Sequence, residues 1–411
     1  MKTIKVGVVG LGGRGFNLME AILLPRENVE VIAVCDLYED RTQAAVDKVQ
    51  EVKGTTPFGT QDYKELLEQP LDAVLVSNSW HEHVPVALAA MEKGIFPGVE
   101  VGGAYSTHEL WQLVDAYERT GTPVMLLENC CYGREELMVL RMVSEGLFGD
   151  IVHGSGGYLH DLRDEVANGR ENRHYRLDNY LRRNTENYPT HELGPIAQIL
   201  DLNYGNRMLT LTSTASRAAG MEAYLAEKKP EDQVLAGSRF QQGDIVTTVI
   251  KCAGGETIVL TLDTTLPRYY SRGFTIRGTK GMYNEENQSI FIDGVHDKHH
   301  FTWKEHWGNA KDYTEDYEHP IWQEYLDEGI KGGHGGMDWL VFDAWLEAVA
   351  NGTEAPIDVY DLASWMVIST LAEESIAMGG HPVAIPDFTK GAWLTRSTRP
   401  EDKRFQLEGG K

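Results

Sequence analysis

The sequence lacks the features of several common protein classes. Its 411 residues include four cysteines, and no two of them have the spacing of a zinc site. We therefore expect reduced, mostly buried thiols and no metal centre. No run of 18 apolar residues indicates a transmembrane helix, and the N-terminal segment lacks the pattern of a secretory signal. These absences predict a cytoplasmic protein with no membrane partner.

Positive charge is also scarce. The chain has 38 lysines and arginines against 62 aspartates and glutamates, which gives a formal net charge of −24. An acidic surface repels the phosphates of nucleic acids and of anionic lipids, so the composition argues against both partners. It favours a small-molecule substrate that is neutral or cationic. The length fits two domains, and 42% hydrophobic residues suffice for two packed cores.

The first part of the chain alternates between strand and helix signals. Short apolar runs predict strands at residues 4–9, 29–35, 73–77 and 124–127, and a helix is expected at residues 17–24. Ser106 and Glu109 form a capping box before a second amphipathic helix that ends near Gly121. Buried strands that alternate with helices are typical of a parallel sheet covered on both faces. We predict an α/β, doubly wound domain at residues 1–128.

The remaining residues have a different pattern. A helix is expected at residues 135–145, and alternating or apolar runs at 245–252, 257–262 and 273–277 predict an open, mainly antiparallel sheet. The acidic, aromatic stretch 312–328 is expected to be a surface excursion. Helices at 337–350 and 362–377 are expected to close this domain. The prediction is an α+β domain at residues 129–411.

A glycine-rich turn follows the first strand. Gly10, Gly12 and Gly15 form a G-x-G-x-x-G pattern that opens the first helix, and Asp36 ends the second strand. In this context the glycines permit a tight turn, a close approach of the pyrophosphate, and packing of the helix on the strand. Asp36 can accept hydrogen bonds from the adenosine ribose, and its charge repels a 2′-phosphate. The pattern therefore predicts NAD and not NADP.

Several later segments are unusually polar. They read NSWHEH at 78–83, ENCCYGREE at 128–136, GGYLHDLR at 156–163 and YPTHELGP at 188–195. With these motifs the whole chain resembles the glucose–fructose oxidoreductase and inositol dehydrogenase superfamily. Within it, the chain resembles the NAD-dependent glycoside hydrolases of family 109, typified by α-N-acetylgalactosaminidase. The resemblance extends from the first strand to about Lys390.

This resemblance implies a reaction in which tightly bound NAD⁺ is not consumed. The sugar C3 hydroxyl is oxidised, a base removes the acidified C2 proton, the C1 leaving group is eliminated, water adds, and the hydride returns. Ordinary glycosidases use two carboxylates, and this route does not. The cofactor supplies the difficult step. The cofactor residues that the turn and the resemblance imply are Gly10, Gly12, Gly13, Arg14, Gly15, Asp36, Asn78, Trp80, His83, Glu100, Val101 and Asn129.

The resemblance also implies a set of sugar-facing residues. Tyr158 is the expected base at C2, His191 the acceptor of the C3 hydroxyl proton, and His160 a group that assists departure of the leaving group. Substrate binding is expected from these groups together with Arg182, Tyr188 and Tyr270.

Two departures from the related families bear on function. Dehydrogenases of the superfamily carry Glu-Lys-Pro where this chain has Glu100-Val101-Gly102, so the lysine proton relay is missing. The family's Tyr-Pro-Thr-His is usually followed by glycine, but here Glu192 follows. The first departure favours the hydrolase, and the second leaves the sugar open. The alternatives are an NAD-dependent sugar or cyclitol dehydrogenase and a non-catalytic NAD or sugar sensor. The superfamily resemblance also predicts a homo-oligomer.

Overall fold

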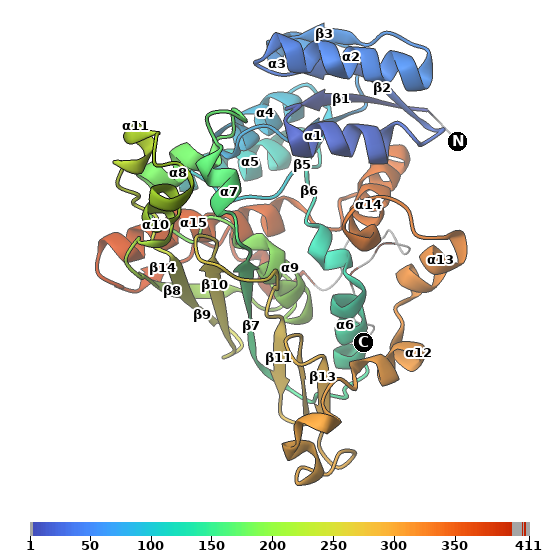
Figure 1. Ribbon diagram of the computed structural model, residues 1–411. Coiled ribbons are helices and arrows are strands. Elements are labelled where there is room, and N and C mark those ends of the chain that lie inside the picture. Colours follow the sequence, from blue (N-terminus) through green and yellow to red (C-terminus); the bar gives the residue numbers. More distant parts are fainter. Residues whose placement is uncertain (1–2, 397–404, 406, 408–411) are drawn as a thin grey trace. The chain divides into compact units, whose positions relative to one another are not determined.

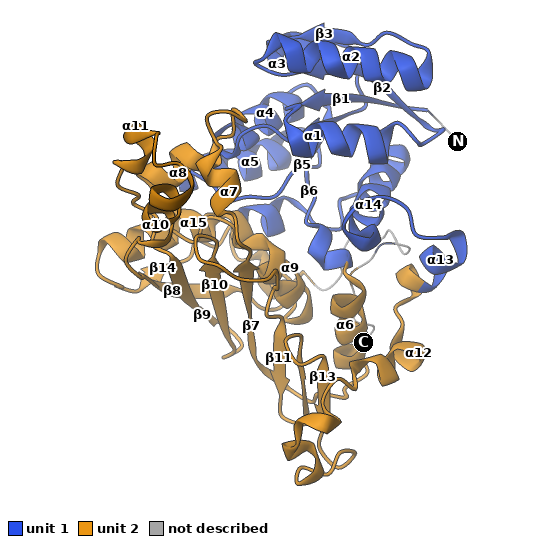
Figure 2. Ribbon diagram, viewed as in Figure 1, with its two compact units in different colours: residues 1–132, 323–363, 398–406 blue, residues 133–322, 364–397, 407–411 orange. Residues whose placement is uncertain are grey.

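The computed structural model describes residues 3–396, 405 and 407. The chain forms two compact units, one of residues 1–132, 323–363 and 398–406 and one of residues 133–322, 364–397 and 407–411 (Figure 2). The chain therefore returns to the first unit after residue 322. The segment 323–363, which the sequence placed with residues 129–411, belongs to the unit that holds the N-terminal sheet.

The first unit contains a six-stranded sheet in which every neighbouring pair is parallel. Its order is β3-β2-β1-β4-β5-β6, the order of a dinucleotide-binding Rossmann fold. The strands are β1 (Ile4–Val9), β2 (Val29–Cys35), β3 (Phe58–Thr60), β4 (Ala73–Val76), β5 (Phe96–Val99) and β6 (Met125–Leu126) (Figure 1). The predicted doubly wound parallel sheet is confirmed.

The connecting segments of this unit are mostly helical. They are α1 (Gly13–Leu18), a π-helical turn η1 (Met19–Leu23), α2 (Glu39–Lys53), α3 (Tyr63–Leu66), α4 (Trp80–Met91), α5 (Thr107–Thr120) and η2 (Asn129–Tyr132). The first helix begins at Gly13, earlier than expected, because the glycine turn leads straight into it. Ser106 is confirmed as the N-cap of α5, since its Oγ accepts hydrogen bonds from the amides of His108 and Glu109.

A late helix completes this unit. The short turn η6 (His334–Gly336) leads into α14 (Met337–Asn351). A Cβ at Gly98 of β5 would lie 2.7 Å from Cε2 of Trp345, so the glycine lets the buried indole lie directly against the sheet. The expectation that α14 closes the second domain is therefore wrong, because its aromatic face packs on the Rossmann sheet.

The second unit contains an eight-stranded sheet of order β13-β12-β11-β7-β10-β9-β8-β14. Neighbouring strands are antiparallel except β7 and β10, which are parallel. The open, mainly antiparallel sheet is thus confirmed. The strands are β7 (Ile151–Leu159), β8 (Met208–Ala215), β9 (Ile245–Cys252), β10 (Thr257–Asp263), β11 (Thr275–Gly278), β12 (Gly281–Asn284), β13 (Ser289–Ile292) and β14 (Val383–Ala384).

Helix α9 (Thr190–Ile199) packs on β7, where a Cβ at Gly154 would lie 2.7 Å from Cγ2 of Ile196. Residues 312–328 include α12 (Thr314–Tyr317) and α13 (Pro320–Glu328). Glu315 and Asp316 are exposed but Trp322 is buried, so the prediction of a surface excursion is correct only in part. The other helices and turns are α6 (Arg134–Ser144), α7 (Arg163–Ala167), α8 (Arg176–Arg182), α10 (Gly220–Lys228), α11 (Gln233–Ala236), η3 (His300–Thr302), η4 (Lys304–His306), η5 (Ala310–Tyr313), α15 (Val359–Ala377) and η7 (Ala392–Leu394).

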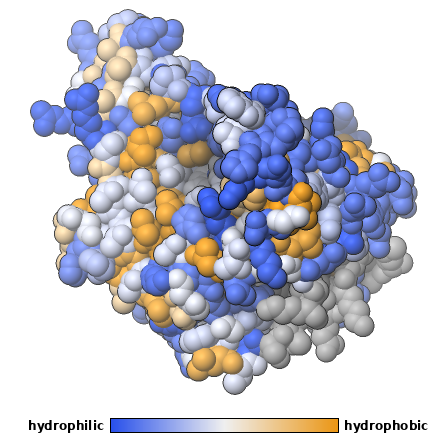
Figure 3. Space-filling model, turned by 90° about the horizontal axis from the view of Figure 1, so that it is seen from below, coloured by the Kyte–Doolittle hydropathy of each residue, from blue (hydrophilic) through white to orange (hydrophobic). Residues whose placement is uncertain are grey.

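The surface and the thiols agree with the composition. All four cysteines are buried thiols. Across residues 3–396, no helix has both the length and the apolar character needed to cross a lipid bilayer. On the face drawn in Figure 3, hydrophobic residues are interspersed with hydrophilic ones.

Candidate functional site

The glycine turn of the first unit is shaped by close contacts of its backbone. Gly10 has a φ of +94°, and a Cβ there would lie 2.3 Å from the amide nitrogen of Asn78. A Cβ at Gly15 would lie 1.9 Å from the carbonyl oxygen of Gly10. Gly13 is different, because nothing lies within 4 Å of the position of its Cβ. Gly10 and Gly15 are therefore required by the fold, whereas the open space at Gly13 fits a ligand that approaches the backbone.

Asp36 ties the end of β2 to this turn. Its carboxylate accepts hydrogen bonds from the amides of Leu11 at 2.7 Å and Tyr38 at 3.0 Å. Arg41 Nη1 lies 3.9 Å from the same carboxylate and 3.5 Å from the Cβ position of Gly12. The carboxylate therefore fixes the turn, and its charge stands at the place expected for the adenosine ribose.

The next predicted residues follow β4. Asn78 precedes α4, and its buried Oδ1 has no hydrogen-bond partner among the described residues. His83 Nε2 lies 3.2 Å from the carbonyl oxygen of Asn78, and burial lowers the pKa of His83 to about 4. His83 is therefore a neutral ring at physiological pH. Trp80 is buried against Gly102, where a Cβ would lie 2.4 Å from the indole.

Arg14, at the start of α1, joins two acidic residues of the same unit. It donates to Glu100 Oε1 at 3.0 Å and to both carboxylate oxygens of Asp338 at 2.8 and 2.9 Å. Burial lowers the pKa of Arg14, but Glu100 and Asp338 outweigh it and raise the pKa above its usual value. Burial raises the pKa of Asp338, but the bonds from Arg14 and His334 hold it well below its usual range. Arg14 and Asp338 are therefore charged at any physiological pH.

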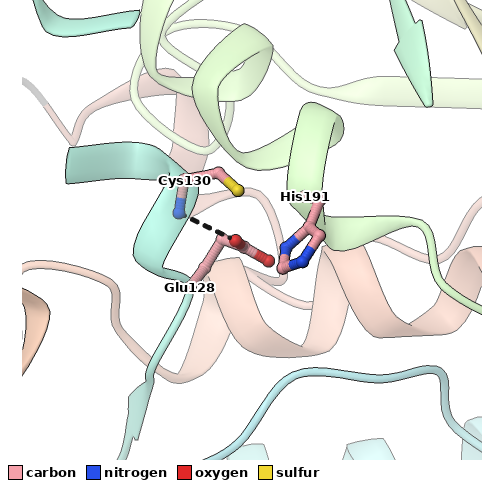
Figure 4. A group of neighbouring side chains, drawn as sticks. All are labelled: Glu128, Cys130 and His191. Atoms are coloured by element: carbon pink, nitrogen blue, oxygen red, sulfur yellow. Dashed lines mark hydrogen bonds between the residues drawn. The ribbon is translucent and has the colours of Figure 1, made fainter. Parts of the chain in front are cut away.

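Asn129 belongs to the network of Arg14 and Asp338. Its Nδ2 donates to Asp338 Oδ1 at 2.8 Å. The neighbouring amide of Cys130 donates to Glu128 Oε1 at 3.1 Å (Figure 4). Val101 is buried and offers no proton-transfer group. Sequence reasoning missed Asp338, because a single aspartate in a late helix carries no signal that it returns to the glycine turn.

The second unit brings five of the predicted sugar residues together. Tyr158 Oη lies 3.0 Å from Nδ1 of His160. The Tyr158 ring centroid lies 4.3 Å from that of Tyr188 and 5.4 Å from that of His191. The Tyr188 and His191 rings are 4.8 Å apart, and the His160 and Tyr270 rings are 5.1 Å apart. Hydroxyl and imidazole groups are thus gathered in one aromatic cluster.

Four elements supply this cluster. Tyr158 stands near the end of β7 opposite Leu262 of β10, and a Cβ at Gly157 would lie 1.8 Å from the carbonyl oxygen of Thr261, so a side chain there would force the strands apart. His160 follows the strand. Tyr188 precedes α9 and His191 lies in its first turn. Tyr270, 49% exposed, lies on the connection from β10 to β11.

Arg176 supplies a positive charge to the cluster. Its guanidinium lies 5.7 Å from the centre of the Tyr188 ring and is paired with Glu165. Burial, followed by the charge of Arg176, lowers the pKa of His160. The predicted Arg182 is six residues further along α8, with a side chain 75% exposed and paired with Asp178 at 2.8 Å. The structure therefore brings Arg176, and not Arg182, to the tyrosines.

Glu192 follows His191 in the first turn of α9. It is fully buried, its Oε1 is 3.4 Å from Nε of Arg272, and its side chain fills the space left by Gly156. Arg272 also pairs with Glu136 at 2.5 Å. Burial raises the pKa of Glu136 to about 7. The glutamate that departs from the family motif thus belongs to an internal ion cluster with Arg272.

Comparison with known proteins agrees with this description. Residues 4–126 match the model of the oxidoreductase family with an NAD-binding Rossmann fold, and residues 132–395 match the C-terminal domain of glycosyl hydrolase 109. A glycosyl hydrolase family 109 protein of Stenotrophomonas maltophilia is 38% identical, with 96% of this chain and 91% of the relative covered. An α-N-acetylgalactosaminidase of Tannerella forsythia is 36% identical, with 96% and 88% covered.

Solved structures share the fold. The myo-inositol dehydrogenase of Lactobacillus casei, in complex with NAD(H) and myo-inositol, has a TM-score of 0.64 at 16% identity and covers 96% of this chain and 100% of its own. An oxidoreductase of Agrobacterium radiobacter, in complex with NAD⁺, L-tartaric acid and magnesium, also has a TM-score of 0.64 at 16% identity, with 93% and 99% covered. On its sequence the chain belongs to glycosyl hydrolase family 109, with an NAD-binding Rossmann fold at its N-terminus.

Proposed function

We propose that this protein is an NAD-dependent glycosidase that acts on small glycosides, with α-N-acetylgalactosaminides as the first candidates. One observation carries the proposal: Tyr158, His160, Tyr188, His191 and Tyr270 form one cluster in a chain whose other unit is a Rossmann fold. The relative named α-N-acetylgalactosaminidase supports the choice of sugar.

The residues of the first unit fit NAD. The open space at Gly13 leaves room for a pyrophosphate, and the partner-free Oδ1 of Asn78 can accept a hydrogen bond from a bound group. Asp36 would accept hydrogen bonds from the adenosine ribose and would disfavour a 2′-phosphate. Trp80, His83, Glu100, Val101 and Asn129 would hold the rest of the cofactor. When bound, NAD⁺ supplies a reversible acceptor for the hydride of the sugar C3 carbon.

The cluster residues move protons. His191 accepts the proton of the C3 hydroxyl, and Tyr158 removes the C2 proton, which is acidic while C3 is a ketone. His160, whose Nδ1 lies 3.0 Å from Tyr158 Oη, receives this proton from the tyrosine and passes it to the departing oxygen at C1, and water then adds to the same carbon. The sum is hydrolysis of one glycosidic bond by one water molecule, without net oxidation.

The remaining residues bind and orient. Tyr188 and Tyr270 hold the sugar through ring and hydroxyl contacts. The charge of Arg176 interacts with Tyr158, which favours the phenolate that acts as a base. Arg182 stays a weaker candidate, because its exposed side chain already pairs with Asp178.

The dehydrogenase alternative has less support. The position of the missing lysine is held by Val101, which is buried, and the next residue, Gly102, packs against the indole of Trp80. A side chain at residue 102 would displace that indole. No amine is therefore present in this segment to relay the proton of an oxidised alcohol.

We also propose that the protein is cytoplasmic and homo-oligomeric. Along β9 buried residues alternate with exposed or half-buried ones, so one face of the second sheet is available to a second copy. Light scattering of the purified chain tests this state. A mass of about one chain at micromolar concentration would contradict it.

The function is tested with nitrophenyl α- and β-glycosides, including the N-acetylgalactosaminides, and only catalytic amounts of NAD⁺. We expect nitrophenol release without accumulation of NADH. NADH that grows in proportion to added NAD⁺, with the glycosidic bond intact, would instead establish the dehydrogenase. Binding of sugar and NAD⁺ without turnover of any substrate would favour the sensor.

A further inference from the structure

The carboxylate of Asp338 is the centre of a hydrogen-bond network in the first unit. Its Oδ1 accepts from Arg14 Nη2 at 2.9 Å and from Asn129 Nδ2 at 2.8 Å. Its Oδ2 accepts from Arg14 Nη1 and lies next to Nδ1 of His334, both at 2.8 Å. Four contacts fill the acceptor positions of a carboxylate, and the side chain is 1% exposed. Asp338 therefore fixes the orientation of Arg14 and His334 together.

The segment that carries His334 lies close against the first helical segment. A Cβ at Gly332 would lie 2.7 Å from Cδ1 of Ile22 in η1, and a Cβ at Gly333 would lie 2.9 Å from Oδ2 of Asp338. These contacts leave no room for a side chain at residue 332 or at residue 333. The glycines bring residue 334 beside Arg14, at the end of the glycine turn and 320 positions away in the chain.

His334 is not the residue that its backbone favours. Its φ of +51° lies in the left-handed region, which glycine adopts without strain and other residues adopt rarely. The neighbouring Gly332, Gly335 and Gly336 are also at positive φ, so a glycine at 334 would serve the loop as well. A strained backbone conformation persists where the surrounding structure imposes it, and such residues are common at functional sites.

The imidazole also has a defined direction. Nδ1 faces Asp338 and lies 3.4 Å from Arg14 Nη1, and 56% of the side chain is exposed. A ring nitrogen held by a carboxylate leaves the other nitrogen to face outward. Two donors, one guanidinium and one imidazole, are therefore held side by side at the phosphate-binding turn. Such a pair matches a phosphate group.

We propose that His334 is a ligand of the cofactor pyrophosphate, and that Asp338 is the positioning residue that orients both His334 and Arg14 for it. This inference rests on the proposed binding of NAD at the glycine turn. The ring of His334 donates a hydrogen bond from Nε2 to a phosphate oxygen. The return of the chain at 323–363 then serves to complete the cofactor site of the Rossmann unit.

The test is calorimetric titration of the full chain with NAD⁺, with ADP-ribose, and with adenosine, which lacks the pyrophosphate. His334→Asn and His334→Gly both tolerate the left-handed backbone, so they remove the ring and keep the loop. We expect each to weaken NAD⁺ and ADP-ribose about tenfold or more, as for loss of a charge-assisted hydrogen bond, and to leave adenosine unchanged. Asp338→Asn is expected to weaken them further. His108→Ala, an exposed histidine of α5, is the matched control.

The outcomes separate the two proposals. If the wild-type chain binds NAD⁺ and both His334 variants bind it equally well, the role of His334 is overturned and the proposed function stands. Equal losses of affinity for NAD⁺, ADP-ribose and adenosine would show that His334 only maintains the structure of the loop. That result would also overturn its role as a pyrophosphate ligand. If the wild-type chain binds neither NAD⁺ nor ADP-ribose, both proposals fail. Should Asp338→Asn not fold, the two His334 variants decide alone.

Discussion

The phenol oxygen of Tyr158 lies 3.0 Å from Nδ1 of His160, two residues further along the same chain segment. Burial, followed by the charge of Arg176, lowers the pKa of His160, so its ring is neutral where the enzyme is expected to work. A neutral imidazole can exchange a hydrogen bond with a phenol in either direction. The pair is therefore a short path for a proton between the two groups that the proposed reaction assigns to C2 and C1.

Removal of the Tyr158 hydroxyl is expected to stop turnover without unfolding the protein. In Tyr158→Phe the ring keeps its place in the core, where the tyrosine is only 8% exposed. We expect kcat to fall by about 10²–10⁴, the usual contribution of a general base, with little change in melting temperature. The matched control is Tyr269→Phe, whose ring is 71% exposed. Tyr158→Phe with wild-type kcat would exclude Tyr158 as the base.

Substitution of the two arginines of α8 should reduce activity to very different extents. Arg176 lies over the ring of Tyr188, whereas the side chain of Arg182 is 75% exposed. We expect Arg176→Met to lower kcat/KM by about tenfold or more, equivalent to about 1.4 kcal/mol, because a buried charge beside the tyrosines is lost. Arg182→Ala is expected to retain activity. Steady-state kinetics of both variants check this. A larger loss of kcat/KM in Arg182→Ala than in Arg176→Met would instead support Arg182 as the substrate residue.

Two glycines of the turn provide a test of structure against binding. Gly15→Ala places a Cβ 1.9 Å from the carbonyl oxygen of Gly10, and we expect a loss of about 1–3 kcal/mol in the free energy of unfolding. Gly13→Ala meets no atom within 4 Å, so unfolding should be unaffected while NAD⁺ binding weakens. Denaturant melts and NAD⁺ titrations of both variants measure this. Unchanged NAD⁺ affinity in Gly13→Ala would contradict the placement of the pyrophosphate.

The buried carboxyl of Glu186 is expected to make stability depend on pH. Glu186 is 1% exposed, and burial raises its pKa to about 8, so the folded state holds a proton that the unfolded state releases near pH 4.5. Its contribution to stability is full below about pH 4.5 and is lost as the pH rises to about 8, by up to about 1.4 kcal/mol for each pH unit.

Glu186→Gln removes this titration. Because the amide cannot ionise, the stability of the variant relative to wild type is expected to rise between about pH 4.5 and 8. Urea melts at several pH values measure the difference. A difference that does not change with pH would show that the Glu186 carboxyl ionises normally in the folded protein. Glu222→Gln, an exposed glutamate of α10, is the control.

Much of the fold follows from local sequence patterns. Both ends of the strand at 29–35 were predicted correctly, because polar residues flank its apolar run on both sides. The capping box at Ser106 marked the start of α5 for the same local reason. The return of residues 323–363 to the first unit was not predictable, since helix α14 is apolar over most of its length and carries no local signal for one sheet over the other. Contacts between residues distant in sequence decide its partner, among them Trp345 against Gly98 and Asp338 with Arg14.

The aromatic cluster and Arg182 were both predicted from a resemblance. Within α8 the sequence RLDNYLR holds two candidate arginines. The buried Leu177 and Tyr180 mark the inner face of this helix, and Arg176 lies beside that face whereas Arg182 does not. Helical periodicity therefore distinguished the two arginines, whereas the resemblance did not. Asp338 left no such signal, because its partners are set by a contact more than 300 residues apart in the chain.

The most direct test of the central claim is hydrolysis of a nitrophenyl N-acetylgalactosaminide in D₂O, followed by mass and NMR analysis of the released sugar. The account predicts one deuterium at C2 of the product, because Tyr158 removes the C2 proton and solvent replaces it. Product released with hydrogen at C2 would contradict the account, since direct hydrolysis at C1 never breaks that bond.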